Sequence, residues 1–247
     1  MSGHNRWSKI KRKKGLSDDR KAKAFTRILK DIAVAVKEGG GTLPESNPHL
    51  KLAMDNARGV NMPKENMQRA IDKASGKDAM AYIETTYEGY GPHGIAIFVE
   101  CTTDNIKRTY SDVRNIFSKH GGNLGTNGSL GFIFERKGIF IVKRGKWNED
   151  DFTLRVIDAG AENIATDDEV FTITTSMENF GTMRKKLEEM KMETESAGLQ
   201  MIPKTTVTLD IKDAKQVLEL IEALEEDEDV HNVYHNLEIT EQLAEAL

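Results

Sequence analysis

The sequence has a single cysteine, Cys101, among 247 residues, and it has no long apolar run. One cysteine excludes an internal disulfide, and it excludes a metal site made only of cysteines from one chain. No strictly apolar run is longer than Ile95–Val99, whereas a transmembrane helix needs roughly 20 apolar residues. No apolar segment follows the charged N-terminus, so we expect no secretory signal and a cytoplasmic location.

Positive and negative charges are unevenly distributed along the chain. Residues 1–78 contain 18 Lys and Arg against 9 Asp and Glu, whereas residues 79–247 contain 17 against 31. Hydrophobic residues make up 38% of the chain, which is enough to bury a core, so wholesale disorder is not expected. A basic end on an acidic body indicates a charged partner, and nucleic acid and an anionic membrane are the two candidates.

The first 14 residues are predicted to form a basic arm. They contain six Lys or Arg and no acid, so like charges repel one another along the segment. This charge density around Trp7 favours nucleic-acid binding over a merely solvated tail. Two roles for Trp7 are equally supported. It either stacks on a base or ribose, or anchors the arm to the helix that follows.

Three amphipathic helices are predicted after the arm. The first runs from an N-cap at Ser17 to a stop at Gly39, and its apolar residues recur at helical spacing. The apolar positions are Phe25, Ile28, Leu29, Ile32 and Val36. The cations on the opposite side are Arg20, Lys23, Arg27, Lys30 and Lys37. A basic amphipathic helix can also lie on a membrane, but two further helices are available to cover the apolar stripe.

The second and third helices are separated by a short turn. The second begins at Pro48 and ends at Gly59, and the third is opened by Pro63 and closed by Gly76. This spacing resembles a helix-turn-helix, although ordinary three-helix packing produces the same pattern. The polar residues expected on the outer surface of the third helix are Lys64, Gln68, Arg69 and Lys73. The candidate nucleic-acid-binding residues are therefore Arg6, Trp7, Lys9, Lys11, Arg12, Lys13, Lys14, Arg20, Lys23, Arg27, Lys30 and Lys64.

Period-two alternation replaces the helical pattern from about Tyr82 onward. Residues 138–201 follow the order β-α-β-β-α-β, which is the ferredoxin-like order. Further strands are predicted at 85–88, 95–102, 132–135, 205–209 and 230–237, with helices at 105–120 and 213–226. These elements are expected to form a second ferredoxin-like domain with the first inserted between its halves. The expected fold class is α+β, with a basic arm and helical domain (1–80), a discontinuous α/β domain (81–136 plus 204–247) and an inserted α/β domain (137–203).

The sequence contains no recognisable catalytic or metal-binding constellation. Gly89–Gly94 formally matches G-x-G-x-x-G, but a strand-like run follows where the dinucleotide-binding motif requires a helix. His231 and His235 are interpreted as structural histidines on a strand, and Cys101 as a small buried residue. The acidic run Glu225–Asp229 is interpreted as a solvated loop. We therefore expect no enzymatic activity, no catalytic residues, no cofactor and no metal.

Several segments resemble the YebC/PmpR family of probable transcriptional regulators. The segments that carry the resemblance are 3–11 (GHNRWSKIK), Phe25-Thr26 onward, 61–66 (NMPKEN), 87–94 (YEGYGPHG) and 121–129 (GGNLGTNGS). The chain has Asn5-Arg6 where the family usually has Ser-Lys, and its loop Gly39–Ser46 also departs from the commoner, shorter form. The resemblance covers nearly the whole chain and is strongest over 1–135.

The resemblance implies a helical N-terminal domain and two α/β domains around a cavity, in a cytoplasmic protein without known enzymatic activity. It implies DNA binding and transcription regulation as the usual role. It equally permits RNA binding on the ribosome, because mitochondrial relatives are translational activators. The expected partner is promoter DNA or ribosomal RNA, with no membrane and no small-molecule substrate. Charge alone does not separate these two partners, because both are polyphosphates.

Overall fold

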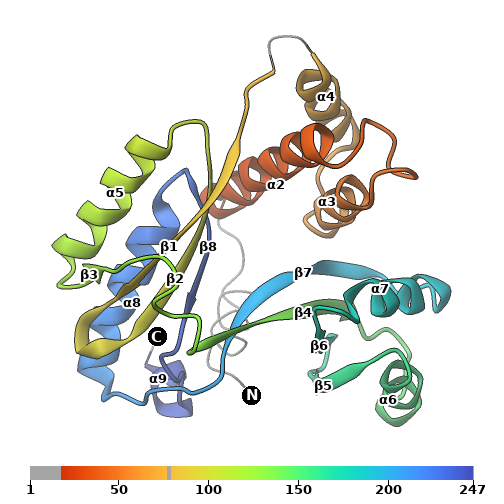
Figure 1. Cartoon of the computed structure of the whole chain (residues 1–247). Helices are drawn as coiled ribbons and strands as arrows, with labels where there is room; N and C mark the ends of the chain where they lie inside the picture. Colours follow the sequence, from red (N-terminus) through yellow and green to blue (C-terminus); the bar gives the residue numbers. More distant parts are fainter. Residues whose placement is uncertain (1–17, 77–78, 247) are drawn as a thin grey trace. The chain divides into compact units, whose positions relative to one another are not determined.

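The structure is a computed structural model that describes residues 18–76 and 79–246 (Figure 1). The described chain forms two compact units. The first unit includes Met80–Glu135 and Met201–Leu247. The second unit includes Ala24–Ala79 and Arg136–Gln200. The expected α+β class with a helical N-terminal region is confirmed. The division into three domains remains a prediction.

Three helices form the described part of the N-terminal region, as predicted. They are α2 (Asp18–Glu38), α3 (Pro48–Gly59) and α4 (Lys64–Ser75). Their shared core contains Ile28, Ile32 and Val36 of α2, with Phe25 and Leu29 packed against it, so the predicted apolar stripe is confirmed. Asn47 caps α3 by accepting the N–H of Leu50 at 3.0 Å, and its amide donates to Ala35 at 2.7 Å. This buried side chain therefore ties the start of α3 to α2.

A ferredoxin-like arrangement follows the helical region within the second unit, as predicted. Its elements are β4 (Phe134–Lys143), α6 (Glu149–Ile157), β5 (Ala161–Thr166), β6 (Val170–Ser176), α7 (Phe180–Glu189) and β7 (Thr194–Pro203). The strands lie in the sheet order β5-β6-β4-β7. Phe152 of α6 stacks on Phe171 of β6 with ring centroids 4.0 Å apart, which helps to fix the helix against the sheet.

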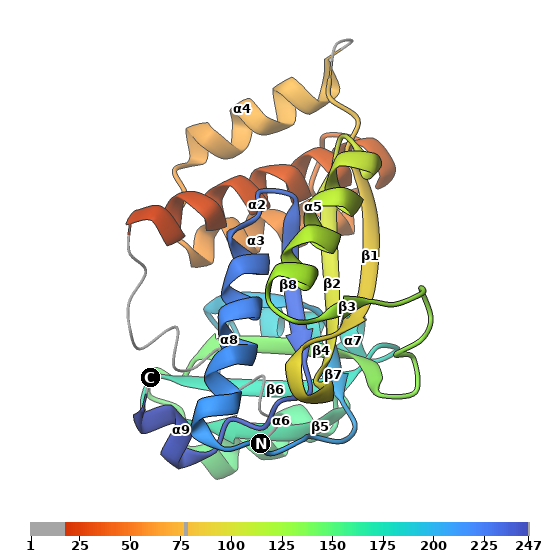
Figure 2. The ribbon, with the colours of Figure 1, turned by 90° about the vertical axis from the view of Figure 1, so that its left-hand side faces the viewer.

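The other sheet belongs to the first unit and has the order β3-β1-β2-β8. Its elements are β1 (Ile83–Tyr90), η1 (Pro92–Gly94), β2 (Ala96–Thr103), α5 (Ile106–Lys119), β3 (Asn123–Leu124), α8 (Ile211–Glu226) and β8 (Val230–His235), followed by α9 (Glu241–Glu245). β1 and β2 form the predicted glycine-rich hairpin. Figure 2 shows α5 and α8 on one face of this sheet, where both contribute to a single core.

Two predicted strands are wrong for this sheet. Residues 132–135 do not join it, because the preceding loop is held in turns before the chain enters β4 of the other sheet. The buried carboxylate of Glu88 holds this loop by accepting the N–H groups of Gly128 at 2.7 Å and Leu130 at 2.6 Å. Residues 205–209 make only an isolated bridge, between Val207 and Leu237. The first unit therefore follows the order β-β-α-β-α-β.

The interpretation of the acidic run as a solvated loop is wrong for Asp229, which is only 7% exposed. Its carboxylate accepts hydrogen bonds from Thr103 at 3.0 Å, Thr109 at 2.9 Å and Arg108 at 2.6 Å. These donors come from the end of β2 and the first turns of α5, so Asp229 fixes α5 to the sheet. The carboxylate of Asp229 can be buried because three donors, one of them the cationic Arg108, form hydrogen bonds with it.

Candidate nucleic-acid interface

Most of the predicted interface falls on the N-terminal arm, which lies outside the described residues. The predicted residues there are Arg6, Trp7, Lys9, Lys11, Arg12, Lys13 and Lys14. Arg20 belongs to the first turn of α2, and its side chain also lies outside the described part of the structure. The described part of the predicted interface is therefore formed by Lys23, Arg27, Lys30 and Lys64.

The predicted basic side of α2 is only partly exposed. Lys23, Arg27 and Lys30 are each intermediate in burial, whereas Lys37 near the end of the helix is exposed. The ammonium group of Lys37 donates a hydrogen bond to the main-chain oxygen of Ala79 at 2.8 Å. The cations of α2 are thus partly covered by other residues, and α2 alone does not present a broad open face.

The outer surface of α4 is the more open of the two helical faces. Lys64, Gln68, Arg69 and Lys73 are all exposed, as predicted, while Met67, Ile71 and Ala74 face the core. The two acids on this surface are already engaged. Glu65 pairs with Arg69 at 3.3 Å, and Asp72 accepts a hydrogen bond from Gln68 at 2.9 Å. Among the ion pairs of the described residues, none involves Lys64 or Lys73.

The N-terminus of α4 adds partial positive charge to this surface. Pro63 occupies the N-cap and makes no side-chain hydrogen bond to the first turn of the helix. A helix N-terminus carries roughly half an elementary charge, and its first N–H groups have no partner within the helix. Lys64 is the first residue of the helix, so its charge adds to that of the helix dipole. A phosphate oxygen is the kind of group that such a position stabilises.

The preceding helix, α3, is anchored elsewhere in the same unit. The amide of Asn56 donates to the oxygen of Ala197 in β7 at 2.9 Å, and its Oδ1 accepts the N–H of Ala197 at 2.8 Å. Arg184 of α7 pairs with Asp55 at 3.2 Å and donates to the oxygen of Pro48 at 3.0 Å. These contacts hold α3 against β7 and α7.

Close packing at the end of α3 reinforces this anchor. A Cβ atom added to Gly59 would lie 1.8 Å from the main-chain oxygen of Glu195, so only glycine allows this approach. Lys51 of α3 also pairs with Glu188 of α7 at 2.7 Å. These residues carry no local sequence signal, because their partners lie more than 100 positions away along the chain. α3 therefore serves as the support that presents α4.

The described residues offer no metal site and no membrane span. They contain no group of three or more His, Cys, Asp or Glu side chains that could hold a metal ion. Within the same part of the chain, no helix is long and apolar enough to cross a bilayer. Cys101 is buried in β2, and His231 and His235 lie on β8.

Comparison with known proteins finds two family models that match consecutive parts of the chain. Residues 5–77 match the TACO1/YebC protein N-terminal domain, and residues 82–237 match the TACO1/YebC second and third domain. Together these matches cover nearly the whole chain. The chain belongs to the TACO1/YebC family.

Individual relatives agree with this assignment. A protein of Amoebophilus asiaticus named "Probable transcriptional regulatory protein" is 47% identical over 240 residues, covering 96% of this chain and 98% of the relative. A protein of Chlorobaculum parvum with the same name is 45% identical over 249 residues, covering 100% and 99%. The crystal structure of a conserved hypothetical protein from Aquifex aeolicus matches with a TM-score of 0.81 and 39% identity, covering 90% of this chain and 91% of that one.

Proposed function

We propose that this protein is a cytoplasmic, non-enzymatic regulator that binds DNA through its basic N-terminal region. The phosphate backbone is contacted by the N-terminal arm, by the partly exposed cations of α2 and by the outer face of α4. The names of the relatives support a role in transcription. The excess of Lys and Arg over Asp and Glu in residues 1–78 supports a polyanionic partner.

The observation that carries the proposal is the exposed cationic face of α4 on a helix pair whose other member, α3, is anchored by Asn56 and Arg184. A nucleic-acid-binding helix must project polar side chains outward from a rigid support, because most of its contacts are to phosphate. Lys64 and Lys73 lie nine residues apart, which is about 13 Å along the helix axis. Nine residues are about two and a half turns, so the two lysines lie at opposite edges of the outer face, and each can contact a phosphate on its own side of the helix.

Fluorescence anisotropy with a labelled 30-base-pair duplex tests the proposal. The test variant replaces Lys64, Arg69 and Lys73 with alanine. The matched control replaces Lys204, Lys212 and Lys215 with alanine. These lysines are also exposed, and their replacement removes the same total charge. We expect about tenfold or greater weakening in the test variant and little change in the control, because several phosphate contacts are lost. Equal affinity of the two variants contradicts the proposed interface.

A second measurement separates transcription from translation. Lysate treated with DNase is fractionated on a sucrose gradient, and the protein is located by immunoblotting. A DNA-binding regulator is expected near the top of the gradient after DNase, and it should give a discrete footprint on promoter DNA at physiological salt. Stable sedimentation with ribosomes after DNase would instead identify ribosomal RNA as the partner and overturn the transcriptional role.

A further inference from the structure

The acidic part of the chain contains basic stretches outside the N-terminal region: residues 136–146 contain five Lys or Arg and no acid, and another stretch covers the helix α5. Residues 105–134 contain four Lys or Arg and one Asp, whereas the rest of 79–247 contains 13 against 30. All four cations lie on a single helix, α5: they are Lys107, Arg108, Arg114 and Lys119. A concentration of positive charge in an otherwise acidic region indicates a distinct polyanion-binding surface.

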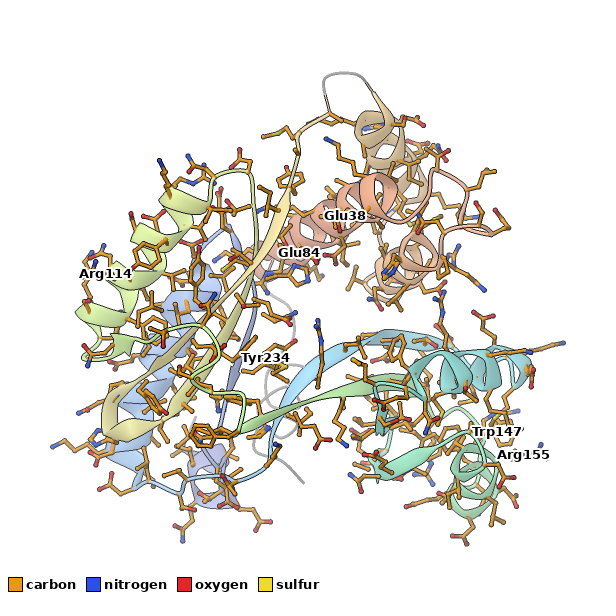
Figure 3. All side chains as sticks on the ribbon, viewed as in Figure 1. Glu38, Glu84, Arg114, Trp147, Arg155 and Tyr234 are labelled. Atoms are coloured by element: carbon orange, nitrogen blue, oxygen red, sulfur yellow. The ribbon has the colours of Figure 1, made fainter. Side chains whose placement is uncertain are left out.

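Two of these cations, Lys107 and Arg114, share one face of α5 with an aromatic ring, and Lys119 lies about 140° further around the helix than Arg114. Lys107, Tyr110 and Arg114 follow the i, i+3, i+7 spacing of one helix face, and all three are exposed. Tyr110 is 44% exposed, so its ring is accessible to a partner. Figure 3 shows Arg114 pointing away from the sheet, and Lys119 is exposed at the end of the helix. From Lys107 to Lys119 the charges extend over about 18 Å.

Lys107, Arg114 and Lys119 differ from Arg108 in their ion pairing within the described residues. Arg108 pairs with Asp229 at 2.6 Å and Asp104 at 2.8 Å, and these hydrogen bonds raise its pKa above the usual value. No ion pair of the described residues involves Lys107, Arg114 or Lys119. Arg108 thus secures the helix, and the other three cations retain charge for a partner.

The inner side of α5 is fixed, so its outer face is preorganised. Val113 and Phe117 are fully buried in the core, and Thr109 donates to the buried carboxylate of Asp229 at 2.9 Å. The ring of Tyr110 lies 6.1 Å from that of Tyr87, which limits its freedom. The helix backbone and the ring of Tyr110 therefore lose little conformational entropy when a partner binds to this face.

We propose that the outer face of α5 binds single-stranded nucleic acid, with phosphates at Lys107, Arg114 and Lys119 and one base stacked on Tyr110. This inference rests on the proposed function, to which it adds a second contact surface. An exposed aromatic side chain between cations is the combination that holds unpaired strands, because any base can stack on it. A duplex keeps its bases inside and offers no such partner for Tyr110. The exposed Glu219 and Glu222 of the neighbouring α8 repel phosphate and limit the surface on that side.

Photo-crosslinking of the full-length protein tests this inference. The probes are a single-stranded 12-mer RNA containing 4-thiouridine and a matching DNA containing 4-thiothymidine, each irradiated with the protein and digested with trypsin. We expect an adduct on the tryptic peptide Thr109–Arg114, which contains Tyr110. The probe that forms the adduct identifies the strand as RNA or DNA. Adducts confined to residues outside α5 would overturn the inference.

Affinity measurements with variants provide the second test. Tyr110→Ala should weaken binding of the single strand about 5- to 150-fold, and Tyr110→Phe should retain it, because the phenyl ring still stacks. Replacing Lys107, Arg114 and Lys119 with alanine should make the slope of log K against log salt shallower by about 2. Circular dichroism verifies that each variant is folded.

The outcomes distinguish this inference from the proposed function. The Lys204, Lys212 and Lys215 variant is again the control, and it should bind the single strand as the wild type does. If the α5 variants match this control while the α4 variant loses duplex binding, the inference is wrong and the proposed function stands. If the wild-type protein binds neither duplex nor single strand at low salt, both are wrong.

Discussion

Replacement of Asn56 with alanine should destabilise the second unit, because this side chain makes two hydrogen bonds to one buried residue. Ala197 is 7% exposed, and Asn56 both donates to its oxygen and accepts its N–H. Each hydrogen bond contributes about 1 kcal/mol, and each buried group left without a partner costs about 1–3 kcal/mol. We therefore expect Asn56→Ala to lower the free energy of unfolding by about 2–4 kcal/mol.

Urea denaturation, together with hydrogen exchange of the Ala197 amide, measures this effect. Asn56→Asp should be at least as destabilising, because its carboxylate accepts the N–H of Ala197 but places a second acceptor against the oxygen of Ala197, 2.9 Å away in the wild type. Asn115→Ala is the control, since Asn115 is exposed on a helix and should change stability by no more than about 0.5 kcal/mol. An Asn56→Ala protein that unfolds like this control would refute the view that α3 is anchored through Asn56.

Three further predictions concern the arm, the glycine-rich loop and α5. Deletion of residues 2–14 should remove most of the nucleic-acid affinity in filter binding without changing the melting temperature; unchanged affinity would contradict the role of the arm. Glu88→Gln should destabilise the first unit by about 2 kcal/mol in urea denaturation and speed amide exchange at Gly128 and Leu130, because an amide presents one acceptor where two are needed. Asp229→Ala should cost about 2–4 kcal/mol, because three donors lose their acceptor, and a melting temperature like that of the wild type would contradict this.

Much of the fold could be predicted from local signals. Proline and glycine at Pro48 and Gly59 mark the limits of α3, and the helical spacing of apolar residues defines the core side of α2. The ferredoxin-like order of 138–201 followed from alternating and helical periods. These features depend on neighbouring residues, so they are visible in a single sequence.

The errors arose where distant contacts override local preference. Residues 205–209 contain β-branched residues typical of a strand. Their pairing with a neighbouring strand is nevertheless limited to the isolated bridge between Val207 and Leu237. The sequence predicts the wrong sheet for residues 132–135. Glu88 fixes the preceding loop through hydrogen bonds to Gly128 and Leu130, and such long-range contacts are not visible in local sequence. Asp229 belongs to an acidic run, and only the fold brings Thr103 and Thr109 to it.

The candidate site was predicted in part. The exposure of Lys64 followed from the helical period, because the apolar positions of α4 define its opposite side. Asn56 and Arg184 could not be found from sequence, since their roles depend on partners in β7 and at the start of α3. The partial covering of Lys23 and Arg27 was likewise invisible, because periodicity reports the side of a helix and not what covers it.

The dependence of duplex affinity on salt is the sharpest test of the proposed nucleic-acid interface. If the wild-type protein neutralises about six phosphates, a plot of log K against log salt has a slope near −5, and replacing Lys64, Arg69 and Lys73 with alanine makes it shallower by about 3. Anisotropy titrations between 50 and 300 mM KCl, roughly the range over which counterion release is measured, give both slopes. Slopes that are equal for the two proteins, or no duplex binding at the lowest salt, would contradict the assignment of the basic N-terminal region as the nucleic-acid interface.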